Sequence, residues 1–275
     1  MSPSAVPGDS NQPKQTALIT GASAGIGRDL AKEFAAHGYD LVLTARREEE
    51  LTKLADELRD AHGTKSEIFA GDLSQSSAPH AIFEFTSQRQ LNIDVLVNNA
   101  GFGANGAFVD IDLKTHMDML AVNISALVEL SRLYLPEMVK NRRGGVLNVA
   151  STAAFVPGPF MTVYYATKAF VLSFSEGLSN EVSGTGVTIS CLCPGATTTE
   201  FQQRAKLDQS RLFAGPHIMS SAAVAREGYD GFAAGKTVVI TGPFNKAAVF
   251  SARLLPRSFA ANVARRLQEP TSHNR

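Results

Sequence analysis

The chain has 275 residues, of which 44% are hydrophobic and 19% are charged, so it has enough apolar material to bury a core. We expect one large α/β domain. The 26 basic residues balance the 26 acidic residues, which excludes a global field that would attract nucleic acid or membrane but leaves local charged patches open.

The first segment, residues 1–14, is rich in proline and serine and contains no apolar run. It predicts a disordered tail and not a signal peptide. No later segment reaches the roughly 18 uninterrupted apolar residues of a membrane span. We therefore expect a cytoplasmic protein.

From residue 15 to residue 242, short apolar runs alternate with amphipathic stretches of helical length. This alternation is typical of βα units and predicts an α/β fold, a doubly wound seven-stranded parallel sheet of the Rossmann type. A ligand of such a sheet binds at the carboxyl ends of the strands. The predicted strands are 16–20, 40–45, 66–70, 94–99, 145–150, 187–193 and 236–241. The predicted helices lie near 25–37, 47–62, 75–90, 112–141, 161–183 and 222–234.

A glycine-rich turn, "TGASAGIG" (20–27), follows the first strand. Its glycines, Gly21, Gly25 and Gly27, would let the backbone approach a pyrophosphate, whose charge then meets free amides at a helix N-terminus. The alternative is that the turn only packs the helix against the sheet.

The second strand ends in Ala45, Arg46 and Arg47, where an NAD-binding fold would place an acidic residue on the adenosine ribose. The missing carboxylate and an available guanidinium favour NADP over NAD. In the alternative interpretation both arginines are ordinary surface charges that precede an acidic first helical turn.

The later stretch "VYYATKAF" (163–170) holds two tyrosines and one lysine. A positive charge nearby makes the ionised phenol easier to reach, so a tyrosine there could exchange protons. On a helix, Tyr164 at i,i+4 and Tyr165 at i,i+3 both come near Lys168. Spacing alone leaves the choice between them open.

The cysteines and isolated histidines give no sign of a metal site. Cys191 and Cys193 lie two apart on a predicted strand, cannot form a sensible disulfide there and lack further ligands. We expect two buried thiols. His116 and His217 have no partners at ligand spacing, and we expect them on the surface or in loops.

Three further motifs, "NNAG" (98–101), "VNISA" (122–126) and "NVASTAAFVPGPFMTVYYATKAF" (148–170), lie between the glycine turn and "CPGATTTEF" (193–201). In this order the set resembles the short-chain dehydrogenase/reductase family over residues 14–240. The amino-acid sequence of these motifs is most similar to the bacterial branch of generalist reductases related to steroid and fatty-acyl carbonyl reductases.

The resemblance implies a catalytic set of Asn123, Ser151, Tyr164 and Lys168. Tyr164 would exchange a proton with the substrate oxygen, which Ser151 would also bind. Lys168 would stabilise the tyrosinate and reach the nicotinamide ribose, while Asn123 would hold a water linking Lys168 to solvent. Tyr165 then becomes a packing residue or a pocket wall.

The resemblance also implies the cofactor contacts. Asp72 would meet the adenine amino group, although it could simply be a capping or turn residue. Asn98 is expected to tie strands together. Part of the "PGATTT" run could be turn chemistry alone. The implied NADP-binding residues are Gly21, Ser23, Gly25, Ile26, Gly27, Arg46, Asp72, Leu73, Asn99, Ala100, Gly101, Tyr164, Lys168, Pro194, Thr197 and Thr199.

A substrate lid is expected at about 200–221, because long loops at such positions are functional. Its apolar residues suggest a hydrophobic carbonyl or alcohol. We therefore expect an NADP(H)-dependent oxidoreductase for an apolar ketone or aldehyde and its alcohol. The alternatives are a dehydrogenase of a small polar hydroxy acid or amino alcohol and a non-catalytic NADP-binding regulatory module. The apolar residues of the lid are Phe201, Leu212, Phe213, Ile218 and Met219, and those outside it that support the same expectation are Phe102, Phe155, Phe160 and Met161.

The C-terminal extension, residues 243–275, contains a basic stretch at 245–267 that has apolar positions and no acidic residue. Such a stretch can lie on an anionic membrane or dock to a partner. Alternatively it is a helix that packs on its own domain and is interrupted at Pro256. From the family we expect a homodimer or homotetramer, formed through the helices at 112–141 and 161–183.

Overall fold

The computed structural model describes residues 14–205 and 218–268. Its centre is a seven-stranded sheet in the order β3-β2-β1-β4-β5-β6-β9, and all neighbouring strands are parallel. The predicted doubly wound fold is therefore confirmed. The strands are β1 Thr16–Thr20, β2 Asp40–Ala45, β3 Ser66–Ala70, β4 Val95–Asn98, β5 Gly145–Val149, β6 Thr188–Cys193 and β9 Val238–Ile240.

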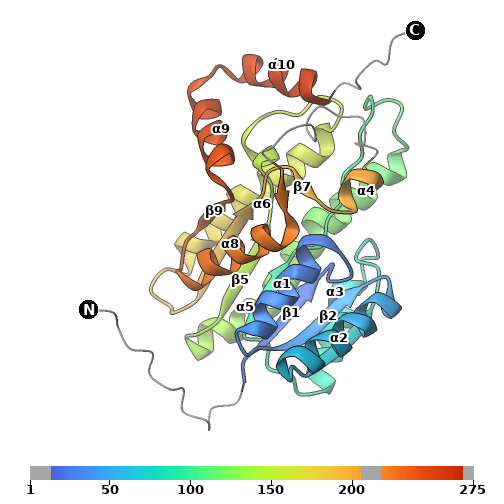
Figure 1. Ribbon diagram of the computed structural model, residues 1–275, viewed down its shortest axis with the longest axis vertical. Helices are drawn as coiled ribbons and strands as arrows, with labels where there is room; N and C mark the ends of the chain where they lie inside the picture. The colour runs from blue at the N-terminus through green and yellow to red at the C-terminus, as the bar shows by residue number, and fades with distance from the viewer. Residues whose placement is uncertain (1–13, 206–217, 269–275) are drawn as a thin grey trace.

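Helices cover both faces of this sheet (Figure 1). Helices α1 (Gly25–Ala36), α2 (Glu48–His62) and α8 (Ser221–Ala233) share one core cluster with the sheet. On the other face pack α3 (Ala78–Gln88), α5 (Ala126–Asn141) and α6 (Thr162–Glu181). Because both faces are covered, the inner strands are continuous apolar runs without polar alternation.

The predicted helix at 112–141 is one helical run, but its middle is π-helical. It consists of α4 (Leu113–Leu120), a π-helical turn η1 (Ala121–Ser125) and α5. The wide turn contains Asn123, whose side chain bonds to the backbone of Phe102 outside the helix. A π-turn of this kind is often found at functional sites.

The strand order reverses between β1 and β4, which lie side by side in the centre of the sheet. The chain leaves β1 toward β2 and leaves β4 toward β5, so the connections diverge at their carboxyl ends. A crevice forms at such a point and is where open α/β sheets bind ligands.

The two cysteines behave as the sequence predicted. Both are free and buried on β6, with their Sγ atoms 3.8 Å apart. The prediction for His116 was wrong: it is 7% exposed on α4, and its ring stacks on Phe108 at a centroid distance of 4.8 Å. The exposed Phe108 ring covers it, which sequence spacing could not reveal. His217 lies outside the described residues.

The C-terminal extension forms two helices, α9 (Pro243–Leu254) and α10 (Arg257–Gln268), with the interruption at Pro256 that the sequence predicted. Figure 1 shows both at the upper end of the molecule. In the described parts of the chain, no helix combines the length and apolar character needed to cross a bilayer.

Short elements surround the sheet's carboxyl edge: a 3-10 turn η2 (Thr152–Phe155), a helical turn α7 (Phe201–Arg204) and a small sheet of β7 (Thr197–Thr198) and β8 (Met219–Ser220). Most of the predicted lid, residues 206–217, lies outside the described residues, and with it Leu212 and Phe213.

Candidate active site

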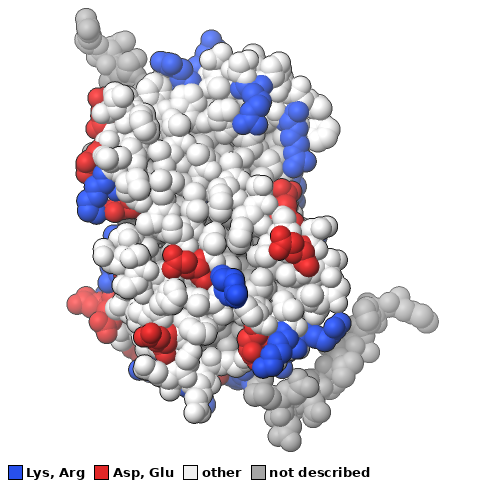
Figure 2. All heavy atoms as spheres, turned by 180° about the vertical axis from the view of Figure 1, so that it is seen from behind, with Lys and Arg blue, Asp and Glu red and all other residues white. Residues whose placement is uncertain are grey.

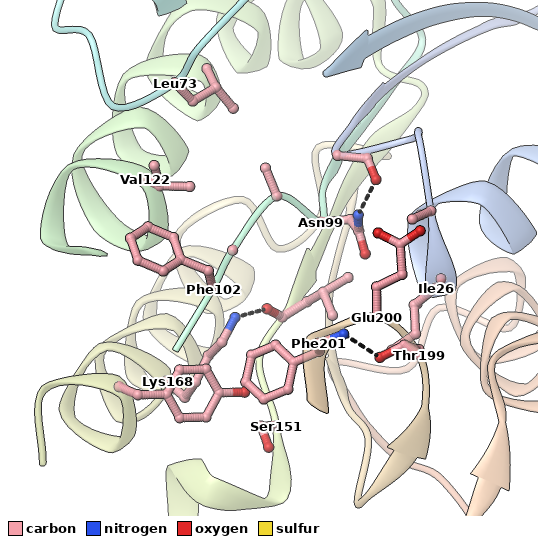
Figure 3. Close-up of a pocket in the computed structure, with 18 of the residues that line it drawn as sticks. Ile26, Leu73, Asn99, Phe102, Val122, Ser151, Lys168, Thr199, Glu200 and Phe201 are labelled. Carbon is pink, nitrogen blue, oxygen red and sulfur yellow. Dashed lines mark hydrogen bonds between the residues drawn. The ribbon is translucent and has the colours of Figure 1, made fainter. Parts of the chain in front are cut away.

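A cavity of about 590 Å³ opens at the carboxyl ends of the central strands. Every residue that the sequence predicted for catalysis or cofactor binding lines it, except Asn123. Figure 3 shows its two ends: Ile26, Thr199 and Glu200 lie near the glycine turn, and Ser151, Lys168 and Phe201 lie together at the other end. The fold thus gathers residues from the whole length of the chain.

The glycine turn leaves no room for side chains. A Cβ on Gly21, which has φ +67°, would lie 2.8 Å from Asn99 Nδ2 and 2.9 Å from Ala100 Cα, and a Cβ on Gly27 would collide with the Gly21 carbonyl. Asn99 braces the turn from β4, because its Nδ2 donates to the Thr20 carbonyl at 2.8 Å. The turn is therefore a rigid backbone wall of the cavity.

Helix α1 begins directly after this turn and offers its free amides to the cavity. Its N-cap residue, Ala24, makes no side-chain capping bond, and no acidic residue occupies its first turn. Uncapped amides and the helix dipole favour an anion at this point. The surroundings therefore fit the pyrophosphate of a dinucleotide.

The two arginines after β2 have different environments. Arg47 Nη2 lies 3.0 Å from Glu200 Oε2 and also donates to the Ser23 carbonyl at 3.3 Å. Arg46 is exposed, lines the cavity and forms no ion pair within the described residues. Its guanidinium is thus the one of the pair that is not held by a carboxylate.

Asp72 lies on the same side of the cavity. Its Oδ1 accepts a hydrogen bond from the Ser74 backbone at 3.0 Å, so the turn interpretation of Asp72 is correct as far as it goes. Burial acts to raise the pKa of Asp72, but the bonds from Ser74 and the charge of Arg46 outweigh it and lower the pKa. The residue is both a turn former and an ionised cavity wall.

Lys168 is 5% exposed on α6, and its Nζ donates to the Val149 carbonyl at 2.8 Å. Burial lowers its pKa to about 8, and the neighbouring Cys191 and Cys193 thiols act in the opposite direction. The ammonium lies 5.7 Å from the centroid of the Tyr164 ring. A Cβ on Gly101 would come within 3.2 Å of Nζ, so the glycine leaves room for the ammonium.

Tyr164 and Ser151 meet at the inner end of the cavity. Burial raises the pKa of Tyr164, and a hydrogen bond with the Ser151 hydroxyl acts in the opposite direction. Ser151 Oγ also accepts from the Ala153 backbone at 3.1 Å and lies 3.3 Å from the Pro194 carbonyl, which fixes its position. A phenol and a hydroxyl held in this way can share one substrate oxygen.

Tyr165 is directed elsewhere. Its ring covers Gly158, and its hydroxyl accepts a hydrogen bond from Gln268 Nε2 at 2.7 Å. It is 8% exposed and lines the cavity. The choice that sequence spacing left open therefore has a geometric answer, because only Tyr164 is paired with Ser151.

Asn123 lies behind the cavity wall and is 1% exposed. Its Oδ1 accepts from the Phe102 N–H at 3.1 Å, and its Nδ2 donates to the Phe102 carbonyl at 3.0 Å and to Thr167 Oγ1 at 3.0 Å. It therefore fixes the loop after β4 beside Lys168. The neighbouring Asn98 ties strands together as predicted, since its Nδ2 donates to Asn148 Oδ1 at 2.9 Å.

The substrate end has apolar walls from Phe102, Met161 and Phe201, and the Phe201 ring lies 5.3 Å from that of Tyr164. Not every predicted aromatic contributes. Phe155 and Phe160 do not line the cavity and instead contact the guanidinium groups of the C-terminal helices. Sequence reasoning missed Glu200 and Gln268, which only the fold brings to the cavity.

Comparison with known proteins agrees with this geometry. A family model described as short chain dehydrogenase matches residues 15–210. A short chain dehydrogenase of Pseudocercospora fijiensis is 38% identical over 188 residues, which cover 68% of this chain and 60% of that protein. Sulfoacetaldehyde reductase 2 of Chromohalobacter salexigens is 37% identical over 67% of this chain and 73% of its own length. The chain therefore matches only part of each relative.

Solved structures show the same likeness. A short-chain dehydrogenase from Sphingobium yanoikuyae in complex with NADPH has a TM-score of 0.77 at 34% identity, covering 87% of this chain and 94% of that chain. A short chain dehydrogenase/reductase from Burkholderia phymatum in complex with NAD has a TM-score of 0.78 at 25% identity, covering 94% and 98%. Similar structures thus hold either nicotinamide cofactor. With its family match, its relatives and its cavity in agreement, this chain belongs to the short-chain dehydrogenase family of oxidoreductases.

Proposed function

We propose that the protein is an NADP(H)-dependent oxidoreductase that interconverts an apolar ketone or aldehyde and its alcohol. The observation that carries the proposal is the convergence of Ser151, Tyr164 and Lys168 in a cavity that begins at the glycine turn. When bound, the nicotinamide supplies or accepts the hydride. The uncapped start of α1 and the glycine turn fit its pyrophosphate.

In the direction of reduction, the phenol of Tyr164 gives its proton to the substrate oxygen as the carbonyl carbon receives hydride, and the alcohol leaves. Oxidation reverses both transfers. Ser151 donates a hydrogen bond to the same oxygen and stabilises the charge that develops on it. Burial would hold the proton on Tyr164 unless a nearby positive charge stabilised the phenolate.

Lys168 is proposed to supply that positive charge. Its Nζ lies close enough to Tyr164 for its charge to favour the tyrosinate, and the Val149 carbonyl orients it. We further propose that it binds the nicotinamide ribose and that Asn123, through the Phe102 backbone, keeps this loop in place. Asn123 is then a positioning residue, while Ser151, Tyr164 and Lys168 are catalytic.

NADP is preferred over NAD because Arg46 is available and the two residues directly after β2 are arginines, with no acid at that place. A guanidinium without a carboxylate partner can bind a 2′-phosphate, whereas an acid at this place would bind ribose hydroxyls. The other proposed contacts are those of the cavity wall, with Asp72 toward adenine and Pro194, Thr197 and Thr199 at the nicotinamide end.

An apolar substrate is favoured by Phe102, Met161 and Phe201 at the reacting end. The polar alternative has one supporting observation, the relative named for sulfoacetaldehyde reduction. A panel of aldehydes and ketones from alkyl to anionic, followed by NADPH absorbance, separates the two. Preferential turnover of the anionic members would replace the apolar proposal, and no turnover on any member would favour a binding module.

The sharpest test of the mechanism compares the two adjacent tyrosines. Tyr164→Phe removes the exchangeable proton and is expected to lower kcat by about 10²-fold or more, with NADPH binding retained. Tyr165→Phe is the matched control and should keep most activity toward a simple ketone. Steady-state kinetics and cofactor fluorescence measure both. The opposite pattern would assign the acid/base role to Tyr165.

We propose a cytoplasmic homodimer or homotetramer formed through α4–α5 and α6, because helices on one face of the sheet can pair across a two-fold axis. Phe170, 39% exposed and stacked on Phe174, is an apolar residue available on α6. Light scattering on the full chain and on Phe170→Asp tests this arrangement.

We also propose that α9 and α10 contact an anionic membrane surface. Phe250 and Leu254 are 66% and 73% exposed and lie four apart on α9, and Phe259 and Val263 are 52% and 43% exposed and lie four apart on α10. Residues at this spacing form one strip on a helix surface. Between residues 243 and 268 there is no acidic residue. The basic residues of the two helices are Lys246, Arg253, Arg257, Arg265 and Arg266.

A further inference from the structure

Helix α10 packs on the body of the protein through a single line of residues, and the last of them lines the cavity. Ala260, Ala264 and Gln268 are spaced four apart, and they are 7%, 6% and 1% exposed. Residues at this spacing share one helix face, so this face is the one packed on the body of the protein. A further contact holds the helix, because the Arg265 guanidinium lies 5.2 Å from the centroid of the Phe160 ring.

The last residue of that line, Gln268, reaches the cavity beside the reacting end. Its Nε2 donates to the Tyr165 hydroxyl at 2.7 Å, and both side chains line the cavity. The Tyr165 ring centroid is 6.1 Å from that of Tyr164. Tyr165 and Gln268 are therefore within reach of a substrate whose carbonyl meets Tyr164 and Ser151.

One atom of Gln268 is left without a hydrogen-bond partner. Its Oε1 is buried, and no described residue donates to it. Buried polar atoms nearly always have a partner, so an unpartnered one at a cavity wall indicates a position that a bound molecule can satisfy. A carbonyl oxygen accepts only, and its partner must be a donor.

We propose that Gln268 and Tyr165 form a hydrogen-bonding subsite for a hydroxyl group of the substrate, remote from the carbonyl that reacts. This inference rests on the proposed function and narrows its substrate class to hydroxy-substituted ketones with an apolar body. The apolar part would lie against Met161 and Phe201, and the hydroxyl would donate to Gln268 Oε1. Tyr165 orients the carboxamide by holding its other end.

Gln268 belongs to the C-terminal extension. Gln268 lies beyond residue 210, where the family match ends, and no hydrogen bond joins it to Ser151, Tyr164 or Lys168. It is therefore a specificity residue and not a catalytic one. Its loss should change which ketone is reduced, and the reaction itself should continue.

The test uses three ketones with one skeleton, bearing a remote hydroxyl, a methoxy group or hydrogen at the same carbon. For the wild type we expect kcat/KM to be about tenfold higher for the hydroxy ketone than for the other two, the effect of one hydrogen bond to substrate. A methoxy group accepts but cannot donate, so it should give no advantage. A wild-type ratio near one, or equal preference for the methoxy ketone, would overturn the subsite.

Gln268→Met keeps the length of the side chain and removes its hydrogen bonds. It should abolish the hydroxyl preference and leave kcat/KM for the unsubstituted ketone within about twofold. Tyr165→Phe should weaken the preference severalfold by freeing the carboxamide. Asn262→Met, at an exposed position on the same helix, is the matched control and should retain it.

The outcomes separate the two proposals. If Gln268→Met folds, reduces ketones and keeps the hydroxyl preference, the subsite is wrong and the proposed function stands. If the wild type reduces none of the three ketones, the proposed function fails and the subsite fails with it. If Gln268→Met does not fold, the wild-type comparison of hydroxyl with methoxy decides alone.

Discussion

Two neighbouring tyrosines on α6 have opposite surroundings although their chemistry is the same. Tyr164 meets Ser151 in the cavity, and Tyr165 turns its hydroxyl to the C-terminal helix. Burial raises the pKa of both. The difference that matters is the partner: a hydroxyl that can share a substrate oxygen in one case, and a carboxamide that orients a wall in the other. The role of each tyrosine therefore follows from the residues it contacts and not from its residue type.

The proposed preference for NADP depends on the Arg46 guanidinium, and its removal tests that proposal. Arg46→Ala should weaken NADPH binding by about tenfold or more, because a charge-assisted bond to the 2′-phosphate is lost. NADH lacks that phosphate, so its affinity should change little. Isothermal titration with both cofactors measures the two losses.

Arg47 provides the control for this prediction. Its charge is already balanced by Glu200 at 3.0 Å, so Arg47→Ala should affect NADPH and NADH similarly. Equal losses for the two cofactors in Arg46→Ala would remove the 2′-phosphate contact from the proposal. A preference lost only in Arg47→Ala would transfer that role to the second arginine.

Burial of Lys168 predicts how stability depends on pH. Its pKa is 10.5 when unfolded and about 8 when folded. Between these values the unfolded chain binds the proton and the folded chain does not, so stability rises with pH across this window. Below about pH 8 the charge is buried at full cost, and above 10.5 the difference in proton binding disappears.

The measurement compares the cofactor-free wild type with Lys168→Met, which has no charge to bury. The methionine variant should lose stability relative to the wild type by about 3 kcal/mol as the pH rises through the window from 8 to 10.5. Urea unfolding at several pH values gives this difference, and groups that titrate in both proteins cancel. A constant difference would mean that the folded pKa of Lys168 is not lowered.

At the scale of elements, the first βα unit could be predicted from the sequence almost completely. Its turn demands glycines at fixed positions, because Gly21 has a positive φ and a Cβ on Gly27 would collide with the Gly21 carbonyl. Such requirements are local, so they fix the residue type at given positions and can be recognised in the sequence. The inner strands β1, β4, β5 and β6 were equally predictable, since they are buried on both faces and consist mainly of apolar residues.

Features set by distant contacts could not be predicted. The π-turn in the 112–141 segment follows from Asn123 bonding to Phe102, 21 residues away. Glu200 meets Arg47 across 153 positions, and Gln268 meets Tyr165 across 103. The hydrophobic periodicity of the sequence does not reveal contacts between residues so far apart in the chain. The same holds for Phe155 and Phe160, which sequence reasoning assigned to the cavity and which the C-terminal helices contact.

At the scale of the whole molecule, the C-terminal helices carry a second apolar surface besides the face they bury. Figure 2, the view from behind, shows Lys and Arg atoms among uncharged atoms around the upper end, where Figure 1 has α9 and α10. The balanced total of 26 basic and 26 acidic residues thus hides a local basic excess. A protein can therefore meet an anionic surface with one end while its net charge is zero.

The basic and apolar surface of α9 and α10 predicts binding to anionic vesicles. Full-length protein should sediment with phosphatidylcholine vesicles that contain phosphatidylserine, and less so as salt rises or without the anionic lipid. Arg257→Gln with Arg266→Gln should reduce sedimentation, whereas the same positions changed to Lys keep the charge and should not. Phe250→Ser with Phe259→Ser should weaken it through the apolar strips. These point variants are preferable to truncation, which would also remove Gln268 from the cavity. Sedimentation that is absent, or unchanged in both the Gln and the Ser variants, would show that α9 and α10 do not bind the membrane.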